Sequence, residues 1–233
     1  MKNYATDAGI KGFVVGVSGG IDSAVTSTLC AQTGLDLICL EMPIHQAKSH
    51  VSRAQEQIAF LKNNYSNVSS KRVDLIPVFE SLKSEIDLNK EQKTVDMALA
   101  NTRARLRMTT LYYYAGLNGF LVAGTGNKVE DFGVGFYTKY GDGGVDLSPI
   151  ADLMKSEVYE IAKFLEVPNT IQKAQPTDGL FGDSRTDEDQ IGASYEELEK
   201  AMQIAHNLDY DLSNREQEVL KIYKSLNSIN RHK

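Results

Sequence analysis

The stretch Gly12-Phe-Val-Val-Gly-Val-Ser18-Gly-Gly-Ile-Asp22-Ser23 decides the fold of this 233-residue chain. Its first half is a short apolar run, which predicts a buried strand over residues 12–18. Its second half opens a helix predicted over residues 22–33, and Gly34 supplies a stop signal. The glycines between them allow a tight turn, and backbone amides at a helix N-terminus attract phosphate. The stretch therefore predicts a phosphate-binding loop between a strand and a helix.

The segments that follow repeat the alternation of strand and helix. Strands are predicted over 35–43, 72–79 and 119–124, with helices over 46–64 and 90–115. Such alternation indicates parallel β-α-β units. After a glycine-rich loop over 124–146, helices are predicted over 152–165, 194–207 and 213–227, the last two opening with capping boxes, and 177–192 is predicted to be a mobile surface loop. We therefore predict one domain over residues 1–233, an α/β fold with a doubly wound parallel β-sheet, helices on both faces and a helical C-terminal part.

Composition excludes several classes of protein. Lys and Arg total 25 and Asp and Glu total 31, giving a net charge of −6, which argues against a nucleic-acid binder or a protein of anionic membranes. The sequence has no run of 18 apolar residues and no signal peptide over residues 1–11. Cys30 and Cys39 form neither a disulfide framework nor a zinc motif, so we expect buried, reduced thiols in a cytoplasmic protein.

The loop itself carries the chemistry. Ser18 and Ser23 add hydroxyl donors, whereas the Asp22 carboxylate would repel a phosphate unless a cation lay between them. Asp22 is therefore a candidate Mg²⁺ ligand. The loop lacks the Gly-Lys-Ser/Thr of a Walker P-loop and the G-x-G-x-x-G of a dinucleotide fingerprint. A plain strand-to-helix turn with a serine cap is the alternative. On the predicted helix over 90–115, Arg103 and Arg107 share one face and Arg105 points elsewhere, so the first two are expected on a solvated face or in surface ion pairs.

The motif S-G-G-x-D-S resembles the signature of the PP-loop ATP pyrophosphatases, which cleave ATP between the α and β phosphates. Later segments resemble one branch of that family, the ammonia-dependent NAD synthetases, in one collinear order over nearly the whole chain. The segments are Asn101-Thr-Arg-Ala-Arg-Leu-Arg-Met108, Gly124-Thr-Gly-Asn-Lys128, Gly135-Phe-Tyr-Thr-Lys-Tyr-Gly-Asp-Gly-Gly144, Asp146-Leu-Ser-Pro-Ile150, Leu153-Met-Lys155 and Pro176-Thr177.

The resemblance implies ATP-dependent amidation of deamido-NAD to NAD with ammonia, through an adenylate, with AMP and pyrophosphate as products. It implies Mg²⁺ as cofactor, a homodimer with substrate near the interface, and no nucleic acid or membrane partner. The implied ATP site comprises Gly16, Val17, Ser18, Gly19, Gly20, Ile21, Asp22, Ser23, Thr125, Lys155 and Thr177. The implied deamido-NAD site comprises Arg105, Lys139, Asp146, His232 and Lys233. Catalytic roles fall to Asp22, Lys155 and Asp142, the last as the group that positions or deprotonates ammonium.

Some alternatives remain open at the level of sequence. The second Mg²⁺ ligand is either Glu130 or Asp131, of which we favour Glu130, because the segment 130–135 is one residue longer than in the family pattern. A separate glutaminase subunit could supply the ammonia. A tRNA-modifying PP-loop enzyme would be expected to show a basic surface and paired cysteines. A non-catalytic nucleotide sensor would be expected to lack Asp22, Lys155 or the metal-binding acid.

Overall fold

The computed structural model describes residues 1–177, 186–205 and 212–233. At its centre lies a parallel four-stranded sheet with the order β3-β2-β1-β4. Val14 pairs with Ile38 on one side and with Val122 on the other, which fixes the register. The strands are β1 (Gly12–Gly16), β2 (Asp36–Glu41), β3 (Val68–Arg72) and β4 (Leu121–Val122). The prediction of a parallel sheet built from β-α-β units is confirmed.

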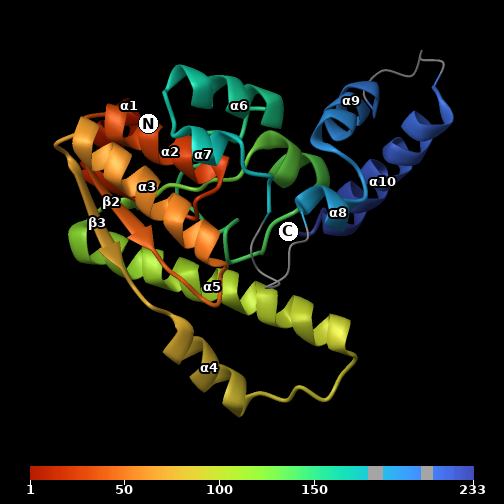
Figure 1. The fold of residues 1–233 in the computed structure, drawn as a ribbon, viewed down its shortest axis with the longest axis horizontal. Helices are drawn as coiled ribbons and strands as arrows, with labels where there is room; N and C mark the ends of the chain where they lie inside the picture. Colours follow the sequence, from red (N-terminus) through yellow and green to blue (C-terminus); the bar gives the residue numbers. More distant parts are fainter. Residues whose placement is uncertain (178–185, 206–211) are drawn as a thin grey trace.

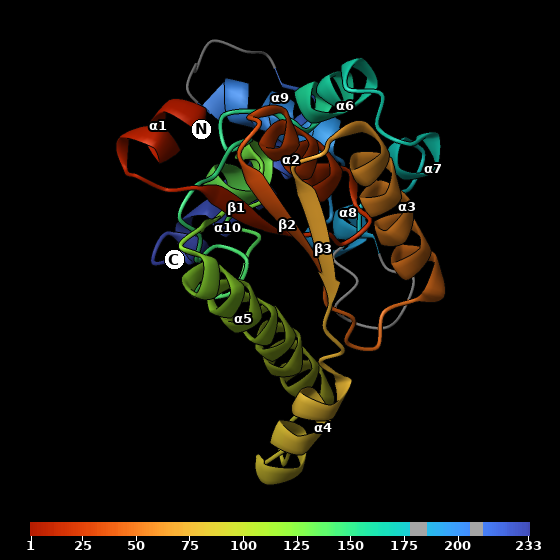
Figure 2. The same cartoon turned by 90° about the vertical axis from the view of Figure 1, so that its left-hand side faces the viewer.

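Alternate residues of β1 point to opposite faces of the sheet, and each face is covered by helices. Phe13 and Val15 pack toward α1 (Lys2–Asp7), α2 (Ile21–Gln32) and α3 (Lys48–Asn64). Val14 packs on the opposite side, against α4 (Ile76–Glu85) and α5 (Gln92–Asn118). Figure 2 shows the strands between these two sets of helices. The sheet is therefore doubly wound, as the sequence predicts.

The third predicted strand, over 72–79, is wrong. Strand β3 spans Val68–Arg72 and the following residues form helix α4. The apolar alternation of 72–79 is misleading because Pro77 has no amide hydrogen and suits the first turn of a helix. The Asp74 side chain accepts a hydrogen bond from the Ile76 amide at 2.9 Å, which supports that turn. β3 is also an edge strand, so a polar sequence is tolerated there.

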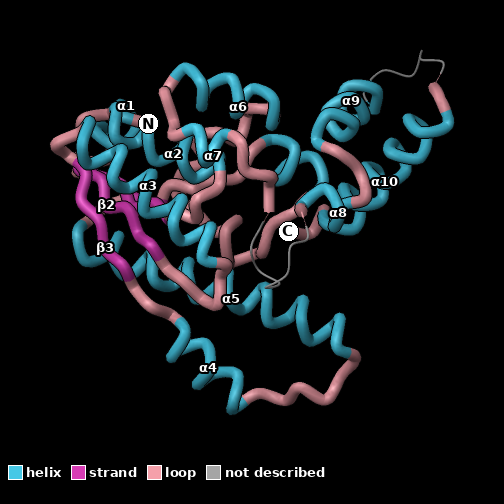
Figure 3. The backbone as a smooth tube through the Cα atoms, in the orientation of Figure 1, coloured by secondary structure: helices cyan, strands magenta, loops and turns pink. Residues whose placement is uncertain are grey.

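The C-terminal part is helical and lies apart from the strands (Figures 1 and 3). A short π-helical segment, η1 (Val129–Val134), packs with the later helices around Leu198. The two predicted capping boxes, Ser194–Glu197 and Ser213–Glu216, both form. The loop predicted over 177–192 is only partly correct, because residues 187–191 form a helix. Residues 178–185 of that loop lie outside the described residues. So do residues 206–207 of the helix predicted over 194–207. The helices are α6 (Lys155–Phe164), α7 (Asn169–Gln172), α8 (Asp187–Ile191), α9 (Tyr195–Ala205) and α10 (Asn214–Asn230).

Strand order determines where a ligand can bind. β1 leads to β2 and β3 on one side, whereas β4 joins on the other side, so the direction of strand addition reverses between β1 and β4. Ligands of open α/β sheets bind at the carboxyl ends of the strands beside such a reversal. The loop after β1 and the segment from Gly124 after β4 lie at that position. Within the part of the chain that the structure describes, no helix is long and apolar enough to cross a membrane.

Candidate active site

The phosphate loop connects β1 to α2 and closes on itself through two serine side chains. The Ser23 hydroxyl donates to the Gly20 carbonyl at 2.9 Å and accepts from the Ser18 amide at 3.2 Å. The Ser18 hydroxyl oxygen accepts from the Gly20 amide and lies 3.1 Å from the Ser23 hydroxyl. The loop therefore gathers two hydroxyls and the start of a helix into one small cradle, an arrangement suited to an anion.

Gly19 is required at its place in this loop. Its φ angle is +85°, in the left-handed region that favours glycine. A Cβ atom there would lie 2.5 Å from the His50 carbonyl oxygen and 2.9 Å from the Ala54 amide nitrogen. No side chain fits between the loop and α3. Gly19 thus lets the loop lie directly against the neighbouring helix.

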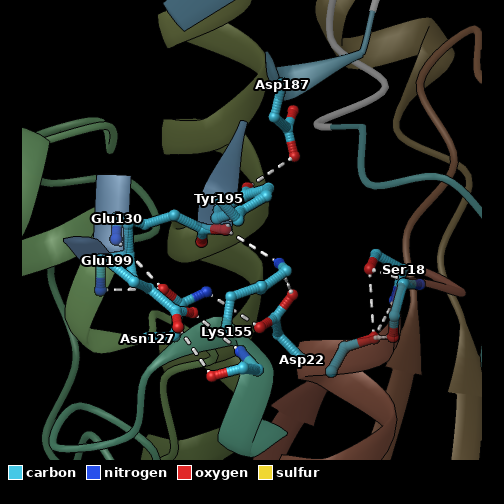
Figure 4. Close-up of polar contacts among 12 residues, drawn as sticks. Ser18, Asp22, Asn127, Glu130, Lys155, Asp187, Tyr195 and Glu199 are labelled. Atoms are coloured by element: carbon cyan, nitrogen blue, oxygen red, sulfur yellow. Dashed lines mark hydrogen bonds and ion pairs between the residues drawn. The ribbon is translucent and has the colours of Figure 1, made fainter. Parts of the chain in front are cut away.

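Lys155 links the two halves of the site (Figure 4). Its ammonium lies 2.7 Å from a carboxylate oxygen of Asp22 and 2.9 Å from one of Glu130. The Lys155 side chain is only 3% exposed, so both carboxylates meet the cation away from bulk water. Asp22 comes from the first turn of α2, Glu130 from η1 and Lys155 from the first residue of α6. Three segments far apart in sequence therefore converge on one point.

Burial and charge act in opposite directions on these groups. Burial raises the pKa of Asp22 more than the Lys155 charge lowers it. For Glu130, burial also acts upward, but the Lys155 charge and a hydrogen bond from Tyr195 bring its pKa below the usual value. Burial alone would lower the pKa of Lys155, yet the two carboxylates raise it overall. The cation is therefore held protonated between the two acids.

Asn127 is a functional residue that the sequence analysis missed. It is fully buried; its amide nitrogen donates to Asp22 at 3.0 Å, and its oxygen accepts from the Val129 and Glu130 amides. One side chain thus orients Asp22 and the start of η1 together. Its position in the segment 124–128, just after a strand at the carboxyl edge of the sheet, is the sequence feature that could have identified Asn127 as part of the site.

Tyr195 and Asp187 are two further residues that the sequence analysis missed. The Tyr195 hydroxyl donates to Glu130 at 2.6 Å and lies 3.2 Å from a carboxylate oxygen of Asp187. The Lys155 ammonium lies 4.6 Å from the centroid of the Tyr195 ring. Both residues come from the C-terminal helices, and Figure 4 shows them above the Lys155 ammonium. No local pattern marked them, because their role depends on contacts across the fold.

A cavity of about 270 Å³ opens beside this cluster. Its wall includes the predicted ATP residues Thr125 and Thr177 and the predicted ammonium residue Asp142. Asp142 accepts a hydrogen bond from the Thr138 amide at 3.0 Å, and burial raises its pKa. The wall also contains a set of apolar residues: Leu40, Met42, Pro43, Val51, Ala104, Met108 and Leu111. The cavity thus combines charged and apolar lining, as a nucleotide requires.

The arginines of α5 differ from their expected positions. Arg107 is half-buried, lines the cavity and donates to the Met42 carbonyl at 3.1 Å, so the expected solvated face is wrong for it. Arg103 is also half-buried, and its guanidinium stacks over Phe79 at 4.4 Å. Arg103 therefore contacts α4, in the region predicted as strand, whereas Arg107 is held by the backbone that follows β2. Arg105 is exposed and points elsewhere, as the helical spacing predicts.

The residues predicted for deamido-NAD lie together outside the cavity. Arg105 donates to the Lys139 carbonyl at 3.1 Å, and the Lys139 ammonium donates to the His232 carbonyl at 2.9 Å. Asp146 accepts from Tyr112 and from the Val122 amide. Arg105 and Tyr112 are seven residues apart on α5 and so share one face. The Lys233 ammonium donates to the carbonyls of Gly135 and Tyr137. Lys139 and Asp146 are therefore bonded to residues of α5, His232 is bonded to Lys139, and Lys233 contacts the segment 135–137.

Glu130 and Asp131, the two candidates for the second Mg²⁺ ligand, differ in where their side chains point. Glu130 meets Asp22 at the Lys155 ammonium, whereas Asp131 packs against Gly126, where a Cβ atom would lie 2.0 Å from its carboxylate. Burial and the neighbouring carboxylates raise the pKa of Asp131 to about 7. Within the described ranges, no group of three or more His, Cys, Asp or Glu side chains is arranged to hold a metal. Glu130 and Asp22 are the acids that face one cation together.

Comparison with known proteins agrees with this arrangement. A family model described as NAD synthase matches residues 1–233. The chain is 40% identical over 200 residues to an NH(3)-dependent NAD(+) synthetase of Finegoldia magna, covering 85% of this chain and 78% of that protein. Among solved structures, it is similar to an NMN synthetase from Francisella tularensis, with a TM-score of 0.87 and 31% identity, covering 99% and 90% of the two chains. It is also similar to an NH3-dependent NAD synthetase from Campylobacter jejuni in complex with nitrate, with a TM-score of 0.76 and 26% identity over 99% and 90% of the chains.

Proposed function

The chain belongs to the NAD synthase family, and on that premise we propose that it is a C–N ligase that amidates deamido-NAD with ammonia and ATP to form NAD. The observation that carries the proposal is the convergence of Asp22, Glu130 and Lys155 beside the phosphate loop and at the charged end of the cavity. A pure binding module needs a cradle for phosphate but no buried cation clamped by two acids. An adenylating enzyme must control charge at that point.

The reaction divides into two transfers. In the first, an oxygen of the nicotinate carboxylate attacks the α-phosphorus of ATP, and the bond to the β-phosphate oxygen breaks to release pyrophosphate. In the second, the ammonia nitrogen attacks the acyl carbon, the bond to AMP breaks, and the nitrogen loses a proton. Adenylation supplies the leaving group that a free carboxylate lacks. The loop amides and hydroxyls, with Lys155, stabilise the charge that develops on the departing pyrophosphate.

The two acids and the cofactor fit one another. Asp22 and Glu130 both contact the Lys155 ammonium, so a metal ion would lie beside that ammonium and not at the point where it sits. Hard carboxylate oxygens combined with substrate phosphates are what Mg²⁺ prefers. We propose that Asp22 and Glu130 would hold Mg²⁺, which would supply neutralisation of the phosphate charge. Asn127 keeps Asp22 oriented. Asp142 lines the same cavity, where it can hold ammonium and take up a proton.

The acceptor binds beside α5, where Arg105, Lys139 and Asp146 gather. The same helix exposes Tyr113 and Leu117, at 64% and 66%, and Tyr112, which bonds Asp146, is partly exposed beside them. We propose that this face joins two copies of the chain into a homodimer with the acceptor near the interface. Size-exclusion chromatography with light scattering should give twice the monomer mass of 25.7 kDa. A monomer at micromolar concentration would contradict this part of the proposal. We place the reaction in the cytoplasm, as the cysteine pattern predicts.

A second candidate acceptor is the mononucleotide, nicotinic acid mononucleotide, whose amidation gives NMN. The observation in its favour is the likeness to the Francisella tularensis NMN synthetase over nearly the full length of both chains. The adenylating cluster would be the same for both acceptors, because the nicotinate carboxylate is the reacting group in each. The difference would lie in what recognises the second half of the dinucleotide.

One assay tests both candidates. The protein is incubated with Mg-ATP and ammonium, with either acceptor in parallel, and amide product, AMP and pyrophosphate are quantified. We expect equal amounts of AMP and pyrophosphate with at least one acceptor, and the ratio of kcat/KM values identifies the substrate. Release of ADP in place of AMP would contradict the proposed reaction class. Absence of turnover with both acceptors would contradict the function itself.

A further inference from the structure

Arg53 of α3 binds the phosphate loop on the side that faces α3. Its Nε donates to the Gly19 carbonyl at 3.0 Å, although 34 residues separate them in the sequence. Arg53 is half-buried, and burial lowers its pKa. Among the described residues, the structure gives Arg53 no carboxylate partner and no hydrogen bond from its terminal Nη atoms. A guanidinium partly withdrawn from water without an acid beside it is suited to pairing with an anion.

The contact with Gly19 controls which way the loop faces. The Gly19 carbonyl and the Gly20 amide belong to one peptide unit, and in a planar trans unit the two point in opposite directions. When Arg53 holds the carbonyl toward α3, the Gly20 amide must turn away from α3. In agreement, Gly20 belongs to the cavity wall while Gly19, in the described part of the chain, packs against His50 and Ala54.

The loop also needs positive charge from elsewhere, because the stretch 16–23 contains no lysine or arginine. Lys155 is already bound by two carboxylates, and Arg107 donates to a backbone carbonyl at the apolar end of the cavity. We propose that Arg53 is a positioning residue of the phosphate loop: it fixes the Gly19–Gly20 peptide so that the Gly20 amide, which donates to the Ser18 hydroxyl, lies on the cavity side of the loop, and its positive charge acts on the ATP phosphates from the side that faces α3. This inference rests on the proposed use of ATP.

The test measures ATP binding separately from turnover. Arg53→Ala should weaken Mg-ATP binding, followed by isothermal titration, about 10- to 100-fold, the range for loss of a hydrogen bond from a charged group. The KM for ATP should rise similarly, while the KM for the acceptor stays within about twofold. Added guanidinium ion should restore part of the ATP affinity. Arg53→Lys should restore less, because an ammonium keeps the charge but lacks the directed Nε.

Lys62→Ala is the matched control. Lys62 lies on the same helix, is exposed and carries the same charge, so its loss should leave ATP affinity unchanged. Unchanged ATP affinity in Arg53→Ala would overturn the proposal, as would an equal loss in both KM values with no rescue by guanidinium. If the wild-type chain binds Mg-ATP but amidates neither acceptor, the proposed function fails while the titration still decides the role of Arg53.

Discussion

The two carboxylates that hold Lys155 are built in different ways. Asp22 belongs to a contiguous loop whose serine hydrogen bonds all form within six residues, and backbone groups supply most of its shape. Glu130 is oriented by Tyr195, 65 residues away, and by Asn127 beside it. The first side depends mainly on local conformation, with one distant hydrogen bond from Asn127 to Asp22, whereas the side chain of Glu130 depends on tertiary packing. Substitutions on the two sides should therefore differ in size and in what else they disturb.

The largest expected loss of activity follows substitution of Asp22, the carboxylate of the phosphate loop. Asp22→Ala removes a carboxylate from the phosphate loop and one partner of Lys155, and we expect kcat to fall about 1,000-fold, as when a preorganised electrostatic group is lost. The fold should remain intact, because the loop is closed by Ser18 and Ser23. AMP formation and the melting temperature measure the two consequences. Asp36→Ala, an exposed acid at the start of β2, is the control. Near-normal turnover in Asp22→Ala would remove Asp22 from the site.

Lys155→Ala removes the contact between the two sides. We expect kcat to fall about 100-fold with a smaller rise in the KM for the acceptor, because the charge is needed most as pyrophosphate leaves. The loss leaves two buried carboxylates unpaired, so the free energy of unfolding should fall by about 3 kcal/mol. Steady-state kinetics and urea titration give both quantities. A raised KM at unchanged kcat would instead make Lys155 a uniform binding residue.

The sequence predicts the local side well and the other side poorly. The phosphate loop, α2 and the parallel β-α-β alternation follow from apolar runs and glycines that lie next to each other in the chain. The segment 72–79 was misassigned because Pro77 begins a helix inside a pattern of alternating residues. Asp187 and Tyr195 carry no local signal, since each acts on a residue brought near only by folding. Asn127 lies in a segment that the sequence marks, but its hydrogen bond to Asp22 depends on folding. Arg107 was expected on the surface because helical spacing does not reveal that β2 ends beside it.

The contacts that orient Glu130 are tested by Tyr195→Phe, which removes one hydroxyl without changing the packed ring. Glu130 would lose its 2.6 Å hydrogen bond and gain freedom to rotate. We expect kcat to fall about 10-fold, with the KM for ATP changing less than twofold, because the phosphate loop is untouched. A higher Mg²⁺ requirement should accompany the loss. Tyr223→Phe removes a hydroxyl from the same helical cluster and should be silent. Equal losses in both variants would indicate a general packing effect.

The smallest effect concerns the C-terminal helices alone. Glu197 accepts two hydrogen bonds from Arg215, which with the Ser194 amide lower its pKa to about 2. A carboxylate with a lowered folded-state pKa stabilises the fold fully above its unfolded value of about 4.3, and the contribution is lost as pH falls toward 2. Glu197→Gln should lower the melting temperature by at most about 3 °C at pH 7, since the pair is exposed to solvent.

That difference in melting temperature should shrink steadily as the pH is lowered from 5 to 3, because protonation of Glu197 in the wild type removes the same interaction. Circular dichroism at matched ionic strength measures it, and Glu196→Gln, on the exposed side of the same turn of α9, controls for loss of one negative charge. Turnover at pH 7 should be unchanged in both variants, because neither residue touches the cluster around Lys155. A difference as large at pH 3 as at pH 5 would show that Glu197 acts through packing and not through its charge.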